Sequence, residues 1–231
     1  MRKAWKNKPH YLILIFLSLA LIIVGVGILN MHARSNNAKI NNFNPSFNNK
    51  GGAMANLKGK KVLIIIAPKD FRDEELLVPL EMLRKAGANV TVASLKKGVA
   101  EGMLGTKFEV NYTIEEVDPD EYDAILFAGG VGATVYFHND YVLNMVRKEY
   151  ENGKIIGAIC IAPVILANAG ILNGKKATVW PSEKKVLEEK GAIYTGEPVT
   201  VDGRIVTANG PKAAEKYAEA VIKLLEEENN S

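Results

Sequence analysis

From residue 58 onward, short apolar segments alternate with longer segments in which apolar residues recur every three or four positions. The short segments are rich in β-branched residues, as buried strands of a parallel sheet are. They are Val62–Ile66, Asn89–Ala93, Ala124–Ala128 and Lys154–Ile159. Helices are predicted over Leu76–Arg84, Tyr141–Tyr150, Ser182–Lys190 and Lys212–Glu227. This alternation predicts an α/β fold in which helices cover both faces of a parallel sheet.

The C-terminal third adds shorter strand signals. Ala177–Trp180 and Ala192–Tyr194 are predicted strands. Val199–Val201 and Arg204–Thr207 form a predicted hairpin, because Asp202-Gly203 between them favours a tight turn. In sheets of this kind the functional site lies at the carboxyl ends of the strands.

The N-terminal residues follow a different pattern. Residues 1–10 are basic, and Tyr11–Leu29 is an almost unbroken apolar run. About 20 apolar residues are enough to span a bilayer, so residues 11–30 are predicted to form a transmembrane signal anchor. The positive charges before it place the N-terminus in the cytoplasm and the following domain outside. A signal peptide cleaved near Met31–Ala33, with secretion of the domain, is the alternative.

Residues 31–57 are predicted to be a linker, because seven asparagines fall between Asn36 and Asn49 and little apolar material is present. Residues 58–231 form the predicted α/β domain. The net charge of +3 arises in the N-terminal part, since residues 58–231 contain 22 Lys and Arg against 26 Asp and Glu. A mildly acidic domain without a basic stripe argues against nucleic acid as a partner. No cofactor and no metal are expected.

The only cysteine, Cys160, stands between a predicted strand and a predicted helix. Small residues, Ala158 and Ala162, lie two positions to either side of it, and Pro163 suits the first turn of the helix. A nucleophile on a sharp strand-to-helix turn requires such small neighbours. The helix N-terminus is also expected to favour the thiolate. The alternative is a buried cysteine that packs as a small apolar side chain.

Two further features are expected at the same sheet edge. Gly129-Gly130 directly follows a strand, and an N–H from this pair together with the N–H of Ile161 would form an oxyanion hole. A plain tight turn is the alternative for the two glycines. The acidic run Asp73–Glu75 suits a solvated helix start. However, Pro79 cannot donate to the Glu75 carbonyl, so the helix should be irregular there. A carboxylate turned inward would have a raised pKa and donate a hydrogen bond to the thiol.

Taken together, these segments resemble the ThiJ/PfpI superfamily, which includes PfpI-type intracellular proteases and the parkinsonism-linked deglycase and chaperone. The resemblance extends from about Lys60 to Leu225 and implies a flavodoxin-like sheet similar to class I glutamine amidotransferases. It also implies a homodimer or larger homo-oligomer. The segments that carry it are Glu75–Pro79, Ala86-Gly87, Ala128–Gly130, Ala158–Pro163, Gly170–Thr178, Asp202-Gly203 and Gly210-Pro211.

By this resemblance Cys160 is the nucleophile and Glu75 is the carboxylic acid that hydrogen-bonds its sulfur. The backbone N–H groups of Gly130 and Ile161 match the oxyanion site of the family. One departure is important. PfpI-type proteases have histidine directly after the nucleophile, where this chain has Ile161, and the deglycase branch has histidine where this chain has Trp180.

Only three histidines are present, His10, His32 and His138, and a solvated loop is the default place for His138. A Cys-His peptidase mechanism then has no proton shuttle. Three functions stay open, the first being a deglycase or glyoxalase that acts on small reactive carbonyls or damaged, glycated protein. The second is a non-enzymatic redox sensor or holdase chaperone. The third, a cysteine peptidase, is disfavoured, and whether the chain is an enzyme at all is left open.

Overall fold

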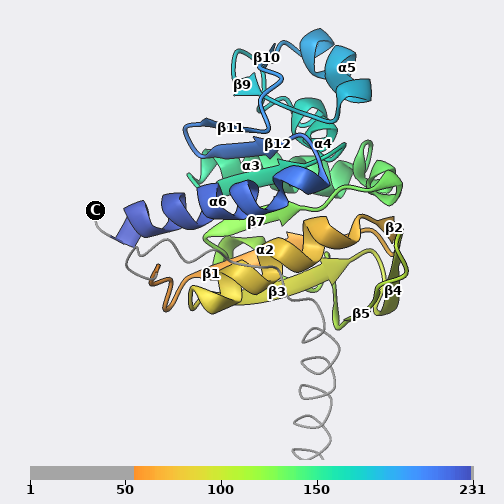
Figure 1. The fold of residues 1–231 in the computed structure, drawn as a ribbon, viewed down its shortest axis with the longest axis vertical. Helices are drawn as coiled ribbons and strands as arrows, with labels where there is room; N and C mark the ends of the chain where they lie inside the picture. The colour runs from red at the N-terminus through yellow and green to blue at the C-terminus, as the bar shows by residue number, and fades with distance from the viewer. Residues whose placement is uncertain (1–54, 230–231) are drawn as a thin grey trace, which may run out of the picture. The chain divides into compact units, whose positions relative to one another are not determined.

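The computed structural model describes residues 55–229, which contain a seven-stranded sheet with the order β11-β12-β8-β7-β1-β3-β6 (Figure 1). All neighbouring strands are parallel except the β11–β12 hairpin. The strands are β1 Lys61–Ile65, β3 Asn89–Ser94, β6 Tyr112–Thr113, β7 Ala124–Phe127, β8 Ile155–Ile159, β11 Val199–Asp202 and β12 Ile205–Ala208. The α/β part of the predicted fold class therefore agrees with the structure.

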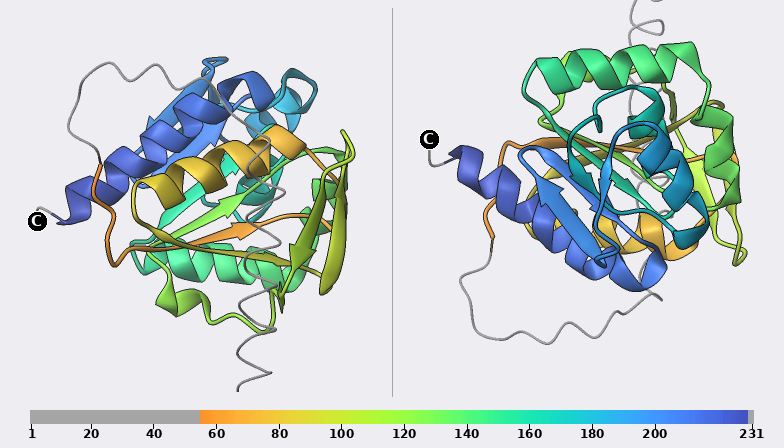
Figure 2. Two further views of the ribbon diagram at one scale, coloured as in Figure 1. Left: turned by 60° about the horizontal axis from the view of Figure 1, so that its bottom comes forward. Right: turned by 90° about the horizontal axis from the view of Figure 1, so that it is seen from above.

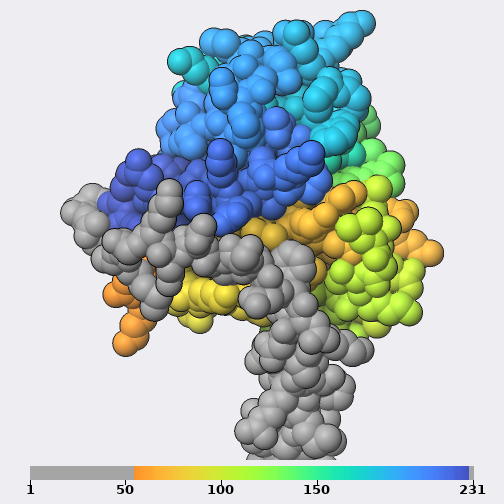
Figure 3. Space-filling view, in the orientation of Figure 1, coloured from red at the N-terminus to blue at the C-terminus, as the bar shows by residue number. Residues whose placement is uncertain are grey.

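The sheet is a central layer between two layers of helices (Figure 2). Helices α2, Asp73–Lys85, and α6, Ala214–Asn229, lie side by side on one face. Helices α3, Asp140–Glu151, and α4, Pro163–Asn168, cover the other. Figure 3 shows that the surfaces of α2 and α6 adjoin on their face of the domain.

The central strands are apolar throughout because both of their faces are buried. In β1, Leu63 and Ile65 belong to the core that includes α3 and α4. Ile64, between them, is equally buried. Strand β8 follows the same pattern, with all five residues buried. Continuous apolar character is the expected signature of a parallel strand covered on both sides.

Two small sheets flank the main one. Strands β2 Lys69–Phe71, β4 Gly98–Gly102 and β5 Lys107–Val110 form one of them, and β9 Lys176–Ala177 with β10 Ile193–Tyr194 forms the other. Short helix α5 is Lys184–Glu189, and the 3₁₀ helices are η1 Pro119–Glu121, η2 Val131–Tyr136, η3 Pro181–Glu183 and η4 Pro211–Ala213. The β2-β4-β5 sheet was not predicted, because these strands are short and largely exposed and so have no continuous apolar run.

Several element boundaries differ from the sequence prediction. Helix α2 begins at Asp73 rather than Leu76 and continues through Pro79. The strand predicted over Ala177–Trp180 is limited to β9. Beyond β9 the chain turns to the main sheet, and the Trp180 N–H donates to the Cys160 carbonyl at 2.8 Å. The segment after Ala177 is therefore hydrogen-bonded to the turn at Cys160 and is not part of β9.

The membrane part of the predicted fold class is corrected. Residues 11–30, the predicted transmembrane signal anchor, lie outside the described residues. Within residues 55–229 no helix combines the length and the apolar character that crossing a bilayer requires. The fold class that the described residues support is the flavodoxin-like α/β domain. The prediction of a single-pass membrane protein with an extracytoplasmic domain is not retained.

Candidate active site

Cys160 occupies a sharp turn between β8 and α4, as the sequence pattern predicts. Its φ is +64°, in the left-handed region that residues other than glycine rarely adopt. The Cys160 N–H donates to the Ala208 carbonyl at 2.9 Å, and its own carbonyl accepts from Trp180. These two bonds hold the strained conformation from both sides, and strained backbone of this kind is typical of functional sites.

Glu75 lies beside the cysteine and is 1% exposed. Its Oε2 accepts a hydrogen bond from the Gly129 N–H at 2.9 Å. A Cβ atom added at Gly129 would lie 2.6 Å from Cys160 Cβ and 2.7 Å from Glu75 Oε2. The absence of a side chain at Gly129 therefore lets the carboxyl and the cysteine approach each other. The two side chains influence each other electrostatically: Cys160 lowers the pKa of Glu75, and Glu75 raises that of the thiol.

The other two acidic residues of the run have different partners. Glu74 forms an ion pair with Arg72, with Nε and Oε2 at 2.7 Å. Asp73 is buried and accepts from the N–H groups of Leu104 and Thr106 at 2.8 and 2.9 Å. Of the three carboxylates, only that of Glu75 turns toward the thiol.

Two backbone N–H groups complete the surroundings of the sulfur. The N–H groups of Gly130 and Ile161 both lower the pKa of the Cys160 thiol, which favours the thiolate. Gly130 has a φ of +87°, and a side chain there would collide with the backbone of Asp70 and Arg72. The structure thus brings Cys160, Glu75, Gly130 and Ile161 together. Their catalytic and oxyanion roles stay a prediction.

Burial controls the protonation of this pair. Burial raises the pKa of Glu75 to about 8, although the Cys160 side chain and the Gly129 N–H lower that pKa. Burial, and then the negative charge of Glu75, raises the pKa of the Cys160 thiol to about 12. The expectation that the helix N-terminus favours the thiolate is therefore outweighed by desolvation. Helix α4 has only six residues, which limits its dipole.

A cavity of about 460 Å³ opens above the thiol. Most of its lining is apolar, from Met103, Val131, Phe137, Ile161, Trp180 and Pro211. Charged groups also reach it, from Arg72 and Glu183. The Trp180 ring packs against Gly210, where an added Cβ would lie 2.8 Å from two ring atoms. Sequence reasoning did not find this lining, since Met103 lies on the unpredicted β4–β5 connection and Val131 on η2.

His138 is the one histidine of residues 55–229, and its side chain is exposed. It does not line the cavity above Cys160. The same part of the chain also holds no cluster of three or more His, Cys, Asp or Glu side chains suited to a metal ion.

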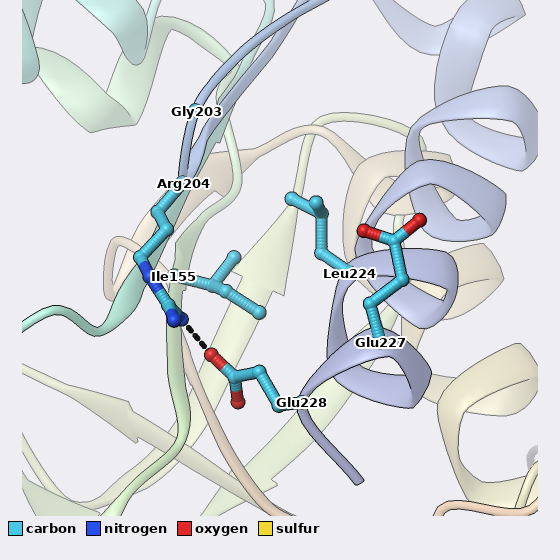
Figure 4. Close-up of a pocket in the computed structure, with 6 residues that line it drawn as sticks. All are labelled: Ile155, Gly203, Arg204, Leu224, Glu227 and Glu228. Carbon is cyan, nitrogen blue, oxygen red and sulfur yellow. Dashed lines mark hydrogen bonds and ion pairs between the residues drawn. The ribbon is translucent and has the colours of Figure 1, made fainter. Parts of the chain in front are cut away.

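A second hollow, of about 240 Å³, lies between α6 and the β11–β12 hairpin (Figure 4). Arg204 extends across it to an ion pair with Glu228 (Figure 4). Ile155, the first residue of β8, lines this hollow, whereas Cys160 follows the last residue of that strand. The hollow therefore lies at the amino end of β8, whereas the thiol lies at its carboxyl end.

A parallel α/β sheet with a strained cysteine after one strand and a buried carboxyl beside it defines the class of cysteine-elbow α/β proteins. This chain belongs to the DJ-1/PfpI family, whose model matches residues 60–224. The resemblance inferred from the sequence segments is thereby confirmed.

Individual relatives agree with the family assignment. An uncharacterized protein of Methanocaldococcus jannaschii is 45% identical over 177 residues, which cover 75% of this chain and 86% of the relative. A deglycase of Pyrococcus abyssi is 33% identical over 163 residues, 71% of this chain and 98% of the relative. The crystal structure of a ThiJ/PfpI domain protein from Brachyspira murdochii matches with a TM-score of 0.71 and 31% identity. It covers 74% of this chain and 98% of that one.

Proposed function

We propose that this protein acts as a deglycase or glyoxalase on reactive carbonyls, or on protein amines that such carbonyls have modified. The observation that carries the proposal is the Cys160 thiol, which lines an apolar cavity, with the buried Glu75 carboxyl beside it. The deglycase names of several relatives support the same class of substrate.

The first step is addition of the sulfur to the aldehyde carbon of an α-oxoaldehyde. A carbon–sulfur bond forms, and the carbonyl electron pair moves to oxygen, where the N–H groups of Gly130 and Ile161 stabilise the charge. Protonation of that oxygen gives a hemithioacetal. The Cys160 thiol has a high pKa, so it must lose its proton as the bond forms. Ionised Glu75, which lies beside the thiol, is placed to accept that proton and to pass it to the oxygen, so that the carboxylate is ionised again for the next step.

In the second step Glu75 moves a proton between carbons. Its carboxylate removes the proton from the carbon bonded to sulfur and returns it to the neighbouring carbon. The hemithioacetal hydroxyl gives its proton to the neighbouring ketone oxygen, so that the thioester of a 2-hydroxy acid is formed. Water then hydrolyses the thioester, releasing a 2-hydroxy acid and restoring the thiol. With a glycated amine, the carbon–nitrogen bond breaks as the carbon–sulfur bond forms. The amine is the leaving group and takes a proton from Glu75. No oxidant is needed, and no histidine is required in either route.

The cavity favours an apolar carbonyl substrate. Its lining places Trp180, Phe137 and Val131 near the thiol. The Arg72 guanidinium, which also lines it, is already neutralised by the ion pair with Glu74. A free anionic group on the substrate would therefore gain little there. We expect phenylglyoxal to be turned over with a lower KM than glyoxal, because the aromatic ring would be buried against apolar side chains.

The test is turnover of methylglyoxal and phenylglyoxal, followed by loss of the aldehyde and appearance of the 2-hydroxy acid. Cys160→Ser should abolish turnover, and Glu75→Gln should lower kcat by at least about 100-fold, the range of general acid–base catalysis. Glu74→Gln, a change at the neighbouring carboxyl that pairs with Arg72, should leave kcat within about twofold. Absence of turnover by the wild type, or turnover that survives Cys160→Ser, would rule the proposal out.

A redox sensor or holdase chaperone is the second candidate. One observation favours the sensor: the Gly130 and Ile161 N–H groups both act on the Cys160 sulfur. These N–H groups would hold the oxygens of a sulfinate formed by peroxide. The raised pKa of the thiol argues against it, because the thiolate is the form that peroxide oxidises. Mass spectrometry after mild peroxide decides between the two. Rapid oxidation of Cys160 without aldehyde turnover would favour the sensor.

A cysteine peptidase stays the least favoured function. Ile161 occupies the position where the proteases of the family carry histidine, and His138 of the described residues lies outside the cavity. Without a histidine beside the thiol, only Glu75 could protonate an amide leaving group. Hydrolysis of unmodified peptides that depends on Cys160 would reverse this ranking.

A further inference from the structure

Tyr217 is a buried tyrosine that the proposed chemistry does not use. It lies on α6 and is 1% exposed, and its hydroxyl has no hydrogen-bond partner among the described residues. A buried polar atom without a partner is costly, so its position calls for a compensating role.

The sheet makes room for this hydroxyl. Gly157 of β8 would, with a side chain, collide with Tyr217 Oη and place its Cβ 2.6 Å from Leu126 Cδ2. Gly157 and Leu126 are directly paired across β8 and β7. A glycine in the middle of a buried strand weakens that strand and typically marks a close approach. Here the group that approaches is the tyrosine hydroxyl.

An unmet acceptor on the neighbouring helix belongs to the candidate active site. Glu75 Oε2 is held by the Gly129 N–H, but Oε1 is buried without a partner among the described residues. Glu75 lies on α2, which packs beside α6 on the same face of the sheet (Figure 1). Two neighbouring helices thus each bring one unsatisfied polar atom to this face, one a donor and the other an acceptor.

We propose that Tyr217 is a positioning residue for Glu75, and that its hydroxyl donates a hydrogen bond to the Glu75 carboxylate when that carboxyl loses its proton. The bond compensates for desolvation of the carboxylate and aligns it with Cys160. Glu75 can then give up and regain its proton within one catalytic cycle.

The electrostatic surroundings agree with this assignment. Burial, and then the charge of Glu75, raises the pKa of Tyr217 well above its ordinary value, so the hydroxyl stays a donor at neutral pH. The other groups that act on Glu75 are the Cys160 side chain and the charges of Arg72 and Glu74. Arg72 lowers the pKa of Glu75 and Glu74 raises it, and these two are themselves an ion pair. Tyr217 is therefore the donor that can act on Glu75 from α6.

The test is a titration of the Glu75 carboxyl by ¹³C NMR in protein labelled at the glutamate side chains, with the signal identified by its loss in Glu75→Gln. Tyr217→Phe should raise the titration midpoint by about one pH unit, since a donor to the ionised form is removed. Tyr136→Phe is the matched control. Tyr136 is equally buried, but its hydroxyl donates to the Ile66 carbonyl at 2.8 Å. Its removal should leave the midpoint unchanged.

An unchanged or lowered midpoint in Tyr217→Phe would overturn the inference, as would an equal shift in both tyrosine variants. A second measurement needs no tyrosine variant. In wild type, the ring carbon that bears the Tyr217 hydroxyl should show a transition at the Glu75 midpoint, and Glu75→Gln should abolish it. Absence of that transition also overturns the inference. The consequence for turnover rests on the proposed function, but the titration uses no substrate, so failure of one is distinguishable from failure of the other.

Discussion

At the scale of single residues, the site depends on two groups that are held in unfavourable states. Cys160 has a left-handed backbone, which costs free energy in any residue with a side chain. Glu75 is a carboxyl removed from water, and burial raises its pKa to about 8. Each is stabilised by specific backbone hydrogen bonds, from Ala208 and Trp180 for the cysteine and from Gly129 for the carboxyl. The strained backbone of Cys160 and the desolvated carboxyl of Glu75 both lower the stability of the folded state at this site.

The raised pKa of Glu75 makes stability depend on pH. The folded protein keeps on Glu75 a proton that the unfolded chain loses above the ordinary value of 4.5. This stabilisation is fully present below pH 4.5 and is lost as pH rises through the folded pKa of about 8. The free energy of unfolding should therefore fall between these two values.

Glu75→Gln removes that dependence, because the amide carries no charge at any pH. We expect the stability of this variant relative to wild type to increase by about 2 to 4 kcal/mol between pH 5 and pH 8.5. Urea denaturation at the two pH values measures the change. Glu74→Gln is the control, and a parallel dependence in both variants would contradict the assignment to Glu75.

At the scale of elements, the first turn of α2 joins the site to the small β2-β4-β5 sheet. Asp73 accepts hydrogen bonds from Leu104 and Thr106 in the β4–β5 connection, and Met103 of that connection lines the cavity. Burial raises the pKa of Asp73, but these hydrogen bonds outweigh it and lower the pKa below its ordinary value. The stabilisation is therefore present above the ordinary value of 3.8 and is lost as pH falls through the folded pKa.

Asp73→Ala should lower the free energy of unfolding by about 1 to 3 kcal/mol at neutral pH, since two N–H groups lose a charged acceptor. Glu74→Ala removes a more exposed ion pair and should cost less than about 1 kcal/mol. Limited proteolysis should show faster cleavage near Leu104 in the Asp73 variant only. Equal stability of the two variants would show that Asp73 does not hold this connection.

At the scale of the whole molecule, several large apolar side chains stay exposed on the described domain. Leu104, Val131 and Val99 are each more than half exposed, and Leu104 and Val131 belong to the connections around the cavity. Exposed apolar surface of this kind favours association with another copy.

We expect the protein to be a homo-oligomer, as the family resemblance implies. Sedimentation velocity of the full chain between about 1 and 50 µM should give a mass of at least two chains, since interfaces that bury apolar surface are stable in this range. A monomer across the whole range would contradict the expectation. If the protein associates, charged substitutions at Val99 and Leu104, tested separately, would locate the interface by the loss of association.

Much of the main sheet could be predicted from the sequence. Strands β1, β3, β7 and β8 were found within about one residue of their bounds, because a strand buried on both faces needs an unbroken apolar run. Cys160 and the pair Gly129-Gly130 were predicted to lie near each other because they come after such strands, and the carboxyl ends of parallel strands meet at one edge. The β2-β4-β5 sheet, with short and half-exposed strands, has no comparable signal. The transmembrane prediction was the main error, because it came from an apolar run alone.

The sequence by itself determined the order of strands and helices, the position of the cysteine and the family. These follow from local composition and spacing. The family resemblance also pointed to Glu75. Only the tertiary structure decided that Asp73 and Glu74 have other partners, and that burial raises the pKa of the Cys160 thiol as well as that of Glu75. It alone decided that the Tyr217 hydroxyl reaches the same sheet face over Gly157. The physical reason is that desolvation and close approach depend on segments brought together from distant parts of the chain, which no local pattern records.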